Sequence, residues 1–244
     1  MRCQPREDKA VYIWTKNKQK CLICDEQTDT TEPLCSACEA ELPWLGGQCS
    51  VCALPLPGEG LICGQCQKRP PSFARVEAPW RYTFPVDSLI TRFKHQQQWP
   101  MGRLLAALLS HHLQHAFAEG LPRPDLLLPV PLGRKRLRQR GFNQAGMLAD
   151  WLGQSLQLPI QAHWLQRHQE GAHQQELGAA ARQRNLRRAF ALHPQAQVAG
   201  RHLALVDDVL TTGATAETLA RLLIKAGALR VDIYCLARTP KPGD

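Results

Sequence analysis

Eight of the ten cysteines form four C-x2-C pairs in the first part of the chain. Two residues between cysteines is the spacing of a zinc knuckle, which presents both sulfur atoms to one tetrahedral ion. The segments 21–38 and 49–66 both read C-x2-C-x10-C-x2-C, so the pattern is an internal repeat with a period of 28 residues. The predicted metal ligands are Cys21, Cys24, Cys35, Cys38, Cys49, Cys52, Cys63 and Cys66.

This repeat predicts two Zn²⁺ ions held by two zinc ribbons. Sequential pairing within each repeat is favoured, although the spacing also allows the first knuckle to pair with the third and the second with the fourth. Four thiolates leave no open position on the ion, so both ions are expected to be structural. Disulfides and an iron–sulfur cluster are the less favoured alternatives, because no secretion signal precedes the repeat and double knuckles more often bind zinc. Few apolar residues lie between the cysteines, so folding of this part should depend on metal.

A second chemical pattern lies near the C-terminus, in VDDVLTTGAT (206–215). The run 203–208 is apolar and ends in two acids, as in a buried parallel strand. Apolar residues at helical spacing follow over 219–226, and 230–237 predicts another strand. Strand, turn, helix and strand form a βαβ unit. Its turn would lie at the carboxyl edge of the sheet, where open α/β folds bind ligands.

The turn of this unit is suited to a phosphate group. Backbone N–H groups at a helix N-terminus bind anions through hydrogen bonds and the helix dipole. Asp207 and Asp208 directly precede the turn, where carboxylates would repel a phosphate but could accept hydrogen bonds from a ribose diol. A glycine lets the backbone approach the anion, and threonine hydroxyls add donors. The predicted phosphate-binding residues are Thr211, Thr212, Gly213, Ala214 and Thr215.

Positive charge is concentrated in RKRLRQR (134–140), directly after the strand-like segment DLLLPVP (125–131). A run of charge is often only a solvated face. This run would lie at the same sheet edge as the phosphate-binding turn, so it predicts contacts with a pyrophosphate or with nucleic acid. Another basic segment follows at 167–190. The contact candidates are Arg134, Lys135, Arg136, Arg138, Arg140 and Arg182.

The remaining pattern predicts the elements that position these groups. Helices are expected from Met101 towards Phe117 and after Asn143, and a third strand is expected around Ile160 to Trp164. The length suits one α/β domain with a small accessory module. The predicted divisions are an N-terminal tail at 1–20, a double zinc ribbon at 21–66, a linker at 67–73 and the α/β domain at 74–240.

Composition limits the classes of protein that fit. The chain is 44% hydrophobic and 21% charged, as in a globular protein. No apolar run approaches the ~20 residues that span a bilayer, and the N-terminus lacks the apolar core of a signal peptide. A cytoplasmic protein without membrane insertion is therefore expected. The formal charge of +9 would fall to about +5 with two filled four-thiolate zinc sites. This basic excess fits phosphate-bearing ligands.

The segments described above resemble known families. VDDVLTTGAT is similar to the phosphoribosyl pyrophosphate (PRPP) motif of type I phosphoribosyltransferases, whose paired acids hold the ribose hydroxyls and whose loop holds the 5′-phosphate. RKRLRQRGFNQAGMLA (134–149) and QQELGAAARQRNLRRAF (174–190), together with the cysteine-rich head, resemble the ComF family. The ending VDIYCLART (231–239) suggests its enterobacterial GntX-like branch.

The resemblance implies an α/β fold, with a type I phosphoribosyltransferase-like parallel sheet and flanking helices behind a small double zinc-ribbon module. It implies binding of PRPP or a related phosphoribosyl ligand, with Mg²⁺ if the protein is active, and a role in competence or the use of external DNA. The segment 167–190 would be a loop that closes over PRPP. No segment identifies an acceptor, so phosphoribosyltransferase activity stays open and no catalytic residue is predicted. The alternative is a non-catalytic protein that uses the fold as a scaffold to bind single-stranded DNA or a competence helicase.

Overall fold

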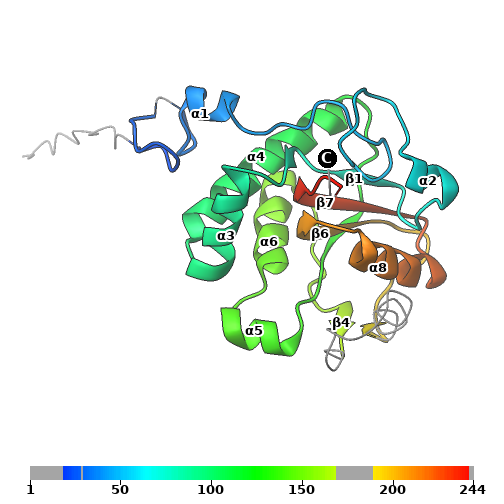
Figure 1. Cartoon of the computed structure of the whole chain (residues 1–244). Helices are drawn as coiled ribbons and strands as arrows, with labels where there is room; N and C mark the ends of the chain where they lie inside the picture. Colours follow the sequence, from blue (N-terminus) through cyan, green and yellow to red (C-terminus); the bar gives the residue numbers. More distant parts are fainter. Residues whose placement is uncertain (1–18, 29, 169–188, 242–244) are drawn as a thin grey trace, which may run out of the picture. The chain divides into compact units, whose positions relative to one another are not determined.

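The computed structural model describes residues 19–28, 30–168 and 189–241 (Figure 1). Contacts between residues divide the chain into two compact units, Met1–Glu41 and Leu42–Asp244. The first unit contains the first cysteine repeat. The second unit contains the second cysteine repeat together with the α/β domain.

A parallel sheet forms the centre of the second unit. The strands follow the order β1-β7-β6-β3, β2 also pairs with β7, and every pairing is parallel. All carboxyl ends therefore lie at one edge, which is the edge expected to bind ligands. The strands are β1 (Arg75–Glu77), β2 (Trp80–Arg81), β3 (Leu126–Pro129), β6 (His202–Leu210) and β7 (Arg230–Arg238).

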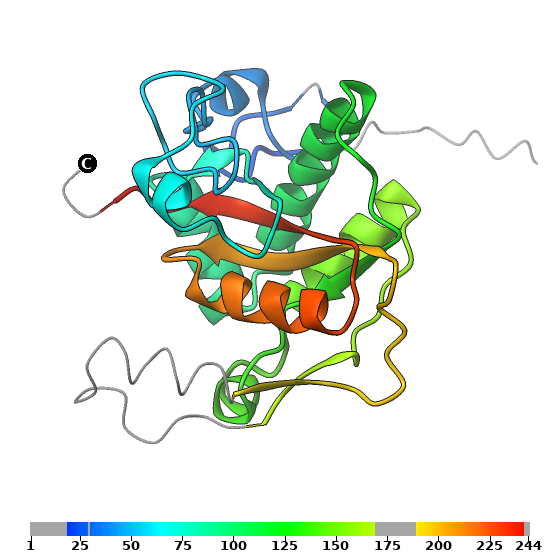
Figure 2. The same cartoon turned by 90° about the vertical axis from the view of Figure 1, so that its right-hand side faces the viewer.

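Helices cover both faces of this sheet (Figures 1 and 2). On one face, α4 (Trp99–Ala118) contacts β7, and α6 (Gln144–Leu156) contacts β6 and β3. A third helix, α3 (Val86–Gln96), packs on α4. On the other face, α8 (Ala214–Lys225) packs against β6 and β7. The expected parallel sheet with flanking helices is confirmed.

The βαβ unit expected over 203–237 is present as β6, α8 and β7. Leu219 and Leu223 lie one turn apart on α8 and are fully buried against the sheet. This apolar face packs the helix against the strands. Gly227 follows the helix with a φ of +95°, a conformation that glycine adopts without strain. Strand β6 is longer than expected, since it continues past the two acids to Leu210, and β7 extends by one residue to Arg238.

The strand expected around Ile160 to Trp164 is not a regular strand. Ile160 makes a single parallel bridge to Leu127, and a turn then leads the chain away from the sheet. The regular strand comes later, as β4 (Leu165–Arg167), which pairs antiparallel with β5 (Phe190–Leu192).

The 28-residue repeat of the sequence is also a repeat of backbone structure. Helix α1 (Ser36–Ala40) and helix α2 (Gly64–Lys68) lie at equivalent positions. Asp25 and Ala53, each directly after a knuckle, both have a positive φ, of 61° and 52°. The N–H of each donates to the carbonyl oxygen of the first knuckle cysteine, at 3.0 and 2.9 Å. The two copies therefore share one backbone plan.

The second repeat is built into the α/β domain. Ala53 has no exposed surface and belongs to the main hydrophobic core, beside Phe73 and the strands. The equivalent Asp25 of the first repeat is exposed. The segment leading into the second repeat also lies along β2, because Leu45 donates to the carbonyl oxygen of Pro79 at 2.8 Å.

Candidate functional site

The turn predicted to bind phosphate lies where β6 ends and α8 begins. The connection has three residues, Thr211–Gly213, so the last two predicted phosphate ligands, Ala214 and Thr215, are already the first residues of the helix. Gly213 has a φ of +75°, and a Cβ built on it would meet no atom within 4 Å. The first N–H groups of a helix have no helical partners. The turn therefore offers backbone donors with open space above its glycine, as anion binding requires.

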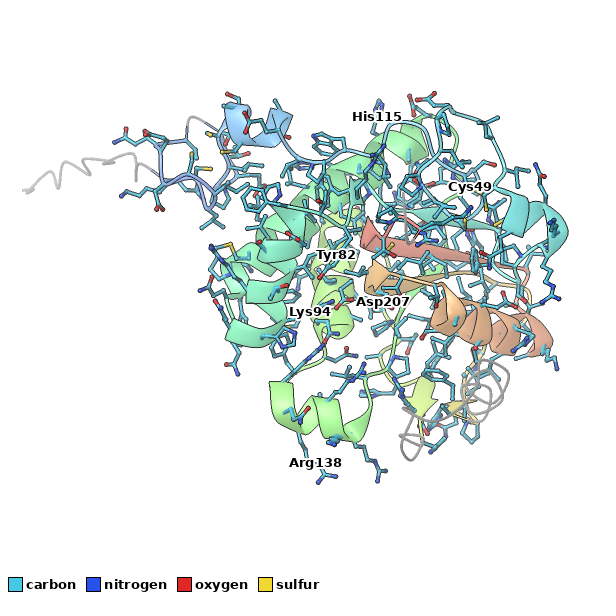
Figure 3. The ribbon with its side chains drawn as sticks, viewed as in Figure 1. Cys49, Tyr82, Lys94, His115, Arg138 and Asp207 are labelled. Atoms are coloured by element: carbon cyan, nitrogen blue, oxygen red, sulfur yellow. The ribbon has the colours of Figure 1, made fainter. Side chains whose placement is uncertain are left out.

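The two predicted ribose-binding acids have unequal surroundings. Asp207 is partly exposed, and its carboxylate accepts from the N–H of Asp208 at 2.9 Å. Asp208 is buried, and its Oδ2 lies 2.9 Å from Nζ of Lys94, in the last turn of α3. Figure 3 shows Lys94 and Asp207 close to each other at this edge of the sheet. Asp208 is thus held in an ion pair, whereas Asp207 is the more accessible acceptor.

Burial raises the pKa of Asp207 to about 7, and the negative charge of Asp208 adds to this shift. The N–H of Asp208 and the positive charge of Lys94 act in the opposite direction. Asp207 therefore exchanges its proton near neutral pH, in the range where a ligand hydroxyl or a nearby cation can change its ionisation.

The basic segment after β3 forms a short helix, α5 (Arg134–Arg140). Its side chains line two different cavities. A cavity of about 190 Å³ is lined by Arg136 and Arg140 together with Lys94 and His95, on the side of the ion pair with Asp208. A cavity of about 500 Å³ is lined by Arg134, Lys135, Arg138, Arg167 and His168. The predicted contact residues are therefore divided into two sets, while Arg182 lies outside the described residues.

The cysteines form two groups, and each group comes from one repeat: Cys21, Cys24, Cys35 and Cys38, and Cys49, Cys52, Cys63 and Cys66. Within each group the four sulfur atoms lie within 4.8 Å of one another. Tetrahedral zinc with bonds of about 2.3 Å separates its sulfur ligands by about 3.8 Å. The pairs Cys24–Cys35 and Cys52–Cys63 are both at 3.7 Å. The geometry fits one zinc ion in each group, with sequential pairing.

Backbone donors favour the charged form of one buried thiol in the second group. Burial by itself raises the pKa of Cys49, but hydrogen bonds from the N–H groups of Cys63, Cys52 and Val51 bring it down to about 7. The N–H of Cys63 lies 3.3 Å from the sulfur. Such donors stabilise a thiolate, which is the form that binds metal.

Comparison with known proteins agrees with both parts of this arrangement. The double zinc ribbon domain matches residues 18–67, and the phosphoribosyl transferase domain matches residues 139–243. The chain is 36% identical over 225 residues to the DNA utilization protein YhgH of Escherichia coli (strain K12), covering 90% of each chain. It is 35% identical over 220 residues to competence protein F of Haemophilus influenzae, covering 89% of this chain and 90% of that one.

The chain belongs to the ComF/YhgH family. The expected resemblance is thereby confirmed, including its DNA-utilization branch. Among solved structures, the purine phosphoribosyltransferase of Pyrococcus horikoshii overlaps 55% of this chain and 70% of its own, with 18% identity and a TM-score of 0.34. The two four-cysteine groups correspond to the double zinc ribbon of the family, and the part of the chain matched by its phosphoribosyl transferase domain includes α6, β6, α8 and β7. Over the described residues, no helix has the length and apolarity needed to cross a bilayer.

Sequence reasoning missed Arg238, which links the second cysteine repeat of this ComF/YhgH chain to the end of β6. Arg238 ends β7 and is only 7% exposed. Its Nε donates to the carbonyl oxygen of Cys52 at 3.0 Å, and its Nη1 donates to that of Leu210 at 3.0 Å and to that of Thr211. The only hint of it in the sequence is a charged residue at the end of an apolar, strand-like segment.

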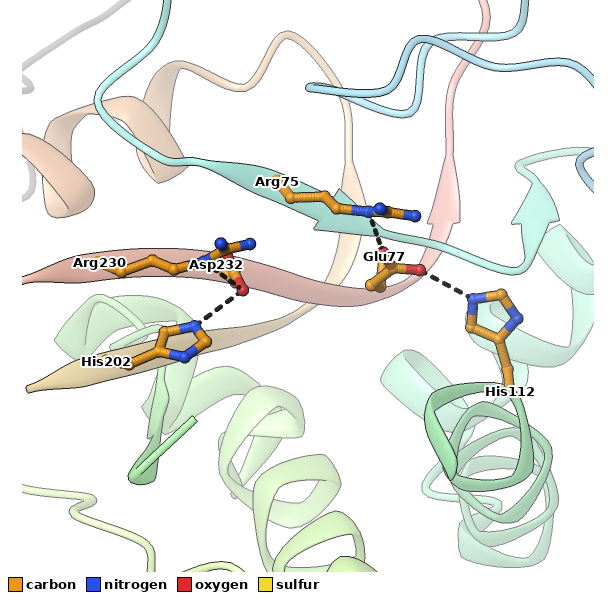
Figure 4. A network of polar contacts seen from close by, with 6 residues as sticks. All are labelled: Arg75, Glu77, His112, His202, Arg230 and Asp232. Carbon is orange, nitrogen blue, oxygen red and sulfur yellow. Dashed lines mark hydrogen bonds and ion pairs between the residues drawn. The ribbon is translucent and has the colours of Figure 1, made fainter. Parts of the chain in front are cut away.

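Figure 4 shows two further groups of polar contacts, one at the amino ends of β6 and β7 and the other at the carboxyl end of β1. Asp232, with no exposed surface, accepts from Nε of Arg230 at 2.9 Å and lies 2.8 Å from Nε2 of His202. Glu77 similarly lies 3.1 Å from Nε2 of His112 and contacts Arg75. These buried carboxylates are paired with neighbouring side chains of the sheet and of α4, which indicates a structural role. His112, on α4, thereby has a buried acidic partner.

Proposed function

We propose that this chain binds PRPP or a related phosphoribosyl ligand at the carboxyl edge of its main sheet, and that it acts in the use of external DNA. One observation supports the proposal: the predicted phosphate-binding turn, a pair of acids and a cationic cavity all lie at that edge. The role in DNA use is supported by its relatives, which are named as DNA utilization and competence proteins.

The turn Thr211–Thr215 would hold the 5′-phosphate. The N–H groups of Ala214 and Thr215 belong to the first turn of a 12-residue helix, so the helix dipole adds to their hydrogen bonds. The open space above Gly213 allows the phosphate to approach the backbone. The nearby hydroxyls of Thr211 and Thr212 add donors.

Asp207 would accept hydrogen bonds from the ribose hydroxyls, since it is the more exposed of the two acids. Asp208 accepts from the N–H of Val209 at 2.7 Å and pairs with Lys94, so its oxygen atoms are partly used within the protein. It would share its remaining acceptor capacity with the ribose. The different positions of the acids therefore support Asp207 as the first contact with the ribose.

The smaller cationic cavity would hold the pyrophosphate. Lys94, Arg136 and Arg140 line it, and guanidinium groups suit phosphate oxygens because they donate in pairs. The described residues offer only cysteine groups as metal cages. Mg²⁺ would therefore arrive bound to the pyrophosphate of the ligand. In a transferase reaction an acceptor would displace pyrophosphate from C1′, and positioning and charge neutralisation would supply most of the catalysis.

The larger cavity on α5 supports a second candidate function, the binding of single-stranded DNA. It is lined by five basic residues, namely Arg134, Lys135, Arg138, Arg167 and His168. Such a surface attracts phosphodiesters without sequence preference, and its affinity falls steeply with salt. The two ligands would use different faces of the same helix, so one function does not exclude the other.

Calorimetric titration of the zinc-loaded protein with PRPP and Mg²⁺ tests the main proposal. We expect saturable binding to the wild type and a loss of about tenfold or more in Asp207→Asn, because the amide keeps the internal hydrogen bond but removes the charged acceptor. Asp150→Asn, a change to an exposed acid of α6, is the matched control and should bind normally. Absence of heat from folded wild-type protein would overturn the proposal.

A further inference from the structure

The second cysteine repeat and the phosphate-binding turn share one buried side chain. Arg238 donates to the carbonyl oxygen of Cys52, a residue of the second cysteine group, and to those of Leu210, which precedes the turn, and Thr211, which begins it. A guanidinium has five donors in a rigid plane, so it holds several acceptors in fixed relative positions. Because Arg238 is 7% exposed, water cannot easily replace a lost acceptor.

A second contact joins the segment that follows the repeat to the start of α8. Ser72 donates to the carboxylate of Glu217 twice, from its N–H at 2.7 Å and from its hydroxyl at 2.9 Å. Glu217 lies in the first turn of α8. A cavity of about 530 Å³ lies between these parts, with Cys66, Gly213 and Arg238 among its lining residues. The turn is thus held at both ends by the second repeat and its continuation.

The two repeats differ at the point where this link is made. Ala53 follows Cys52 directly and is inserted into the core, with a positive φ and no exposed surface. At the equivalent place in the first repeat, Asp25 is exposed. The backbone plan is shared, whereas burial in the α/β core is a property of the second copy.

We propose that the second cysteine group, when it holds its metal, fixes the conformation of the phosphate-binding turn, and that Arg238 is the positioning residue between them. This inference rests on the proposed function for its phosphate ligand. When the four cysteines are held together by metal, the turn at Cys49–Ala53 is fixed and the carbonyl oxygen of Cys52 stays within reach of Arg238. When they separate, the guanidinium loses that acceptor and the carbonyl groups of Leu210 and Thr211 lose a fixed partner. The N–H groups of the turn then no longer converge on one position for the phosphate.

A pair of matched variants in the full chain tests this. Cys66→Ser removes a ligand of the second group, and Cys38→Ser removes the ligand at the equivalent position of the first. Each should retain one zinc ion by elemental analysis. We expect amide hydrogen exchange over Leu210–Thr215 to rise about tenfold, and PRPP affinity to fall about tenfold, in Cys66→Ser only. Exchange in α4 serves as the reference for general loosening.

Arg238→Lys tests the link without disturbing the cysteines. A lysine keeps the charge but lacks the planar set of donors. We expect two zinc ions, normal exchange in α4, and the same local rise in exchange at the turn. Equal behaviour of the two cysteine variants, or normal exchange at the turn in Arg238→Lys, would overturn the inference. If the wild type binds no PRPP, the proposed function fails while the exchange data still decide whether the link exists.

Discussion

Asp207 and Asp208 are adjacent in the sequence, yet the fold gives them different tasks. Successive side chains of a strand point to opposite faces, so one acid is partly exposed and the other reaches Lys94 of α3. The pair could be recognised from the sequence, because acids directly before a turn of small residues are a local pattern. The ion pair could not, because it depends on how α3 packs on the sheet.

The raised pKa of Asp207 predicts a pH-dependent cost to stability. Its pKa is raised to about 7 in the folded chain, so the unfolded chain releases the proton more easily. The free energy of unfolding therefore falls as the pH rises from about 4 to 7. Asp207→Asn removes this loss. We expect the variant to gain on the order of 1–2 kcal/mol over the wild type at pH 8, after allowing for partial exposure, and less at pH 6.

Chemical denaturation of both proteins at pH 6, 7 and 8 measures this difference. Loss of zinc at lower pH affects both proteins alike, so the difference between them isolates Asp207. Asp150→Asn should show no trend. A gain that stays the same at all three pH values would contradict the assignment of the shift to Asp207.

Asp232 predicts a stability effect without a binding effect. It is fully buried and pairs with Arg230 and His202. Asp232→Asn removes the charge that pairs with Arg230 and contacts His202, and we expect a loss of about 3 kcal/mol in the free energy of unfolding. Asp125→Asn keeps an acceptor for the N–H of His202 and should cost less than about 1 kcal/mol. PRPP affinity of the folded Asp232→Asn protein should be unchanged, and a selective loss of affinity would show that the network reaches the site.

At the scale of elements, local patterns predicted β6, α8, β7, α4 and the start of α6 correctly. The apolar period in each was long, and Asn143 caps α6 as its position suggested, accepting from the N–H of Ala145 at 3.2 Å. The prediction of a strand near Ile160 was wrong, because that segment makes only a single bridge to β3 before the chain turns away. Whether a short segment of this kind forms a regular strand depends on the residues that pack against it in space.

Helix α5 predicts separable effects of charge reversal on its two faces. Arg140 lines the smaller cavity with Lys94, and Arg138 lines the larger one. We expect Arg140→Glu to lower PRPP affinity about tenfold with little effect on oligo(dT). Arg138→Glu should leave PRPP binding intact and reduce the salt slope of oligo(dT) binding by about 1. Titrations of both variants with both ligands, at several salt concentrations, check this, and identical effects of the two changes would mean that the faces act as one surface.

At the scale of the whole molecule, the sequence identified both the metal repeat and the α/β domain. It did not indicate that the second repeat is built into that domain, because the residues responsible, Ala53 and Arg238, carry no local pattern. The small core of this repeat consists of Leu54 and three buried cysteines, packed with partly buried neighbours. Such a core cannot hold a fold without cross-links.

Removal of metal should therefore act on the repeats first. We expect two zinc ions per chain, and we expect a chelator to unfold 21–38 and 49–66 while the helices of the α/β domain persist. Elemental analysis and far-UV circular dichroism, with excess zinc restored as the control, measure this. An unchanged spectrum together with an absence of bound zinc would contradict both ribbons.

The two repeats differ in how far the rest of the protein orders them, and this difference determines which of them loses its zinc ion first. Among the described residues of the first unit, only Cys21 and Leu34 are buried, so the ion must supply most of the ordering there. The second repeat is already partly ordered by the core around Ala53 and by Arg238. Where less binding free energy is used for folding, more is left as affinity. A rising chelator concentration should then empty the first ribbon before the second, and the protein should pass through a state that holds a single zinc ion.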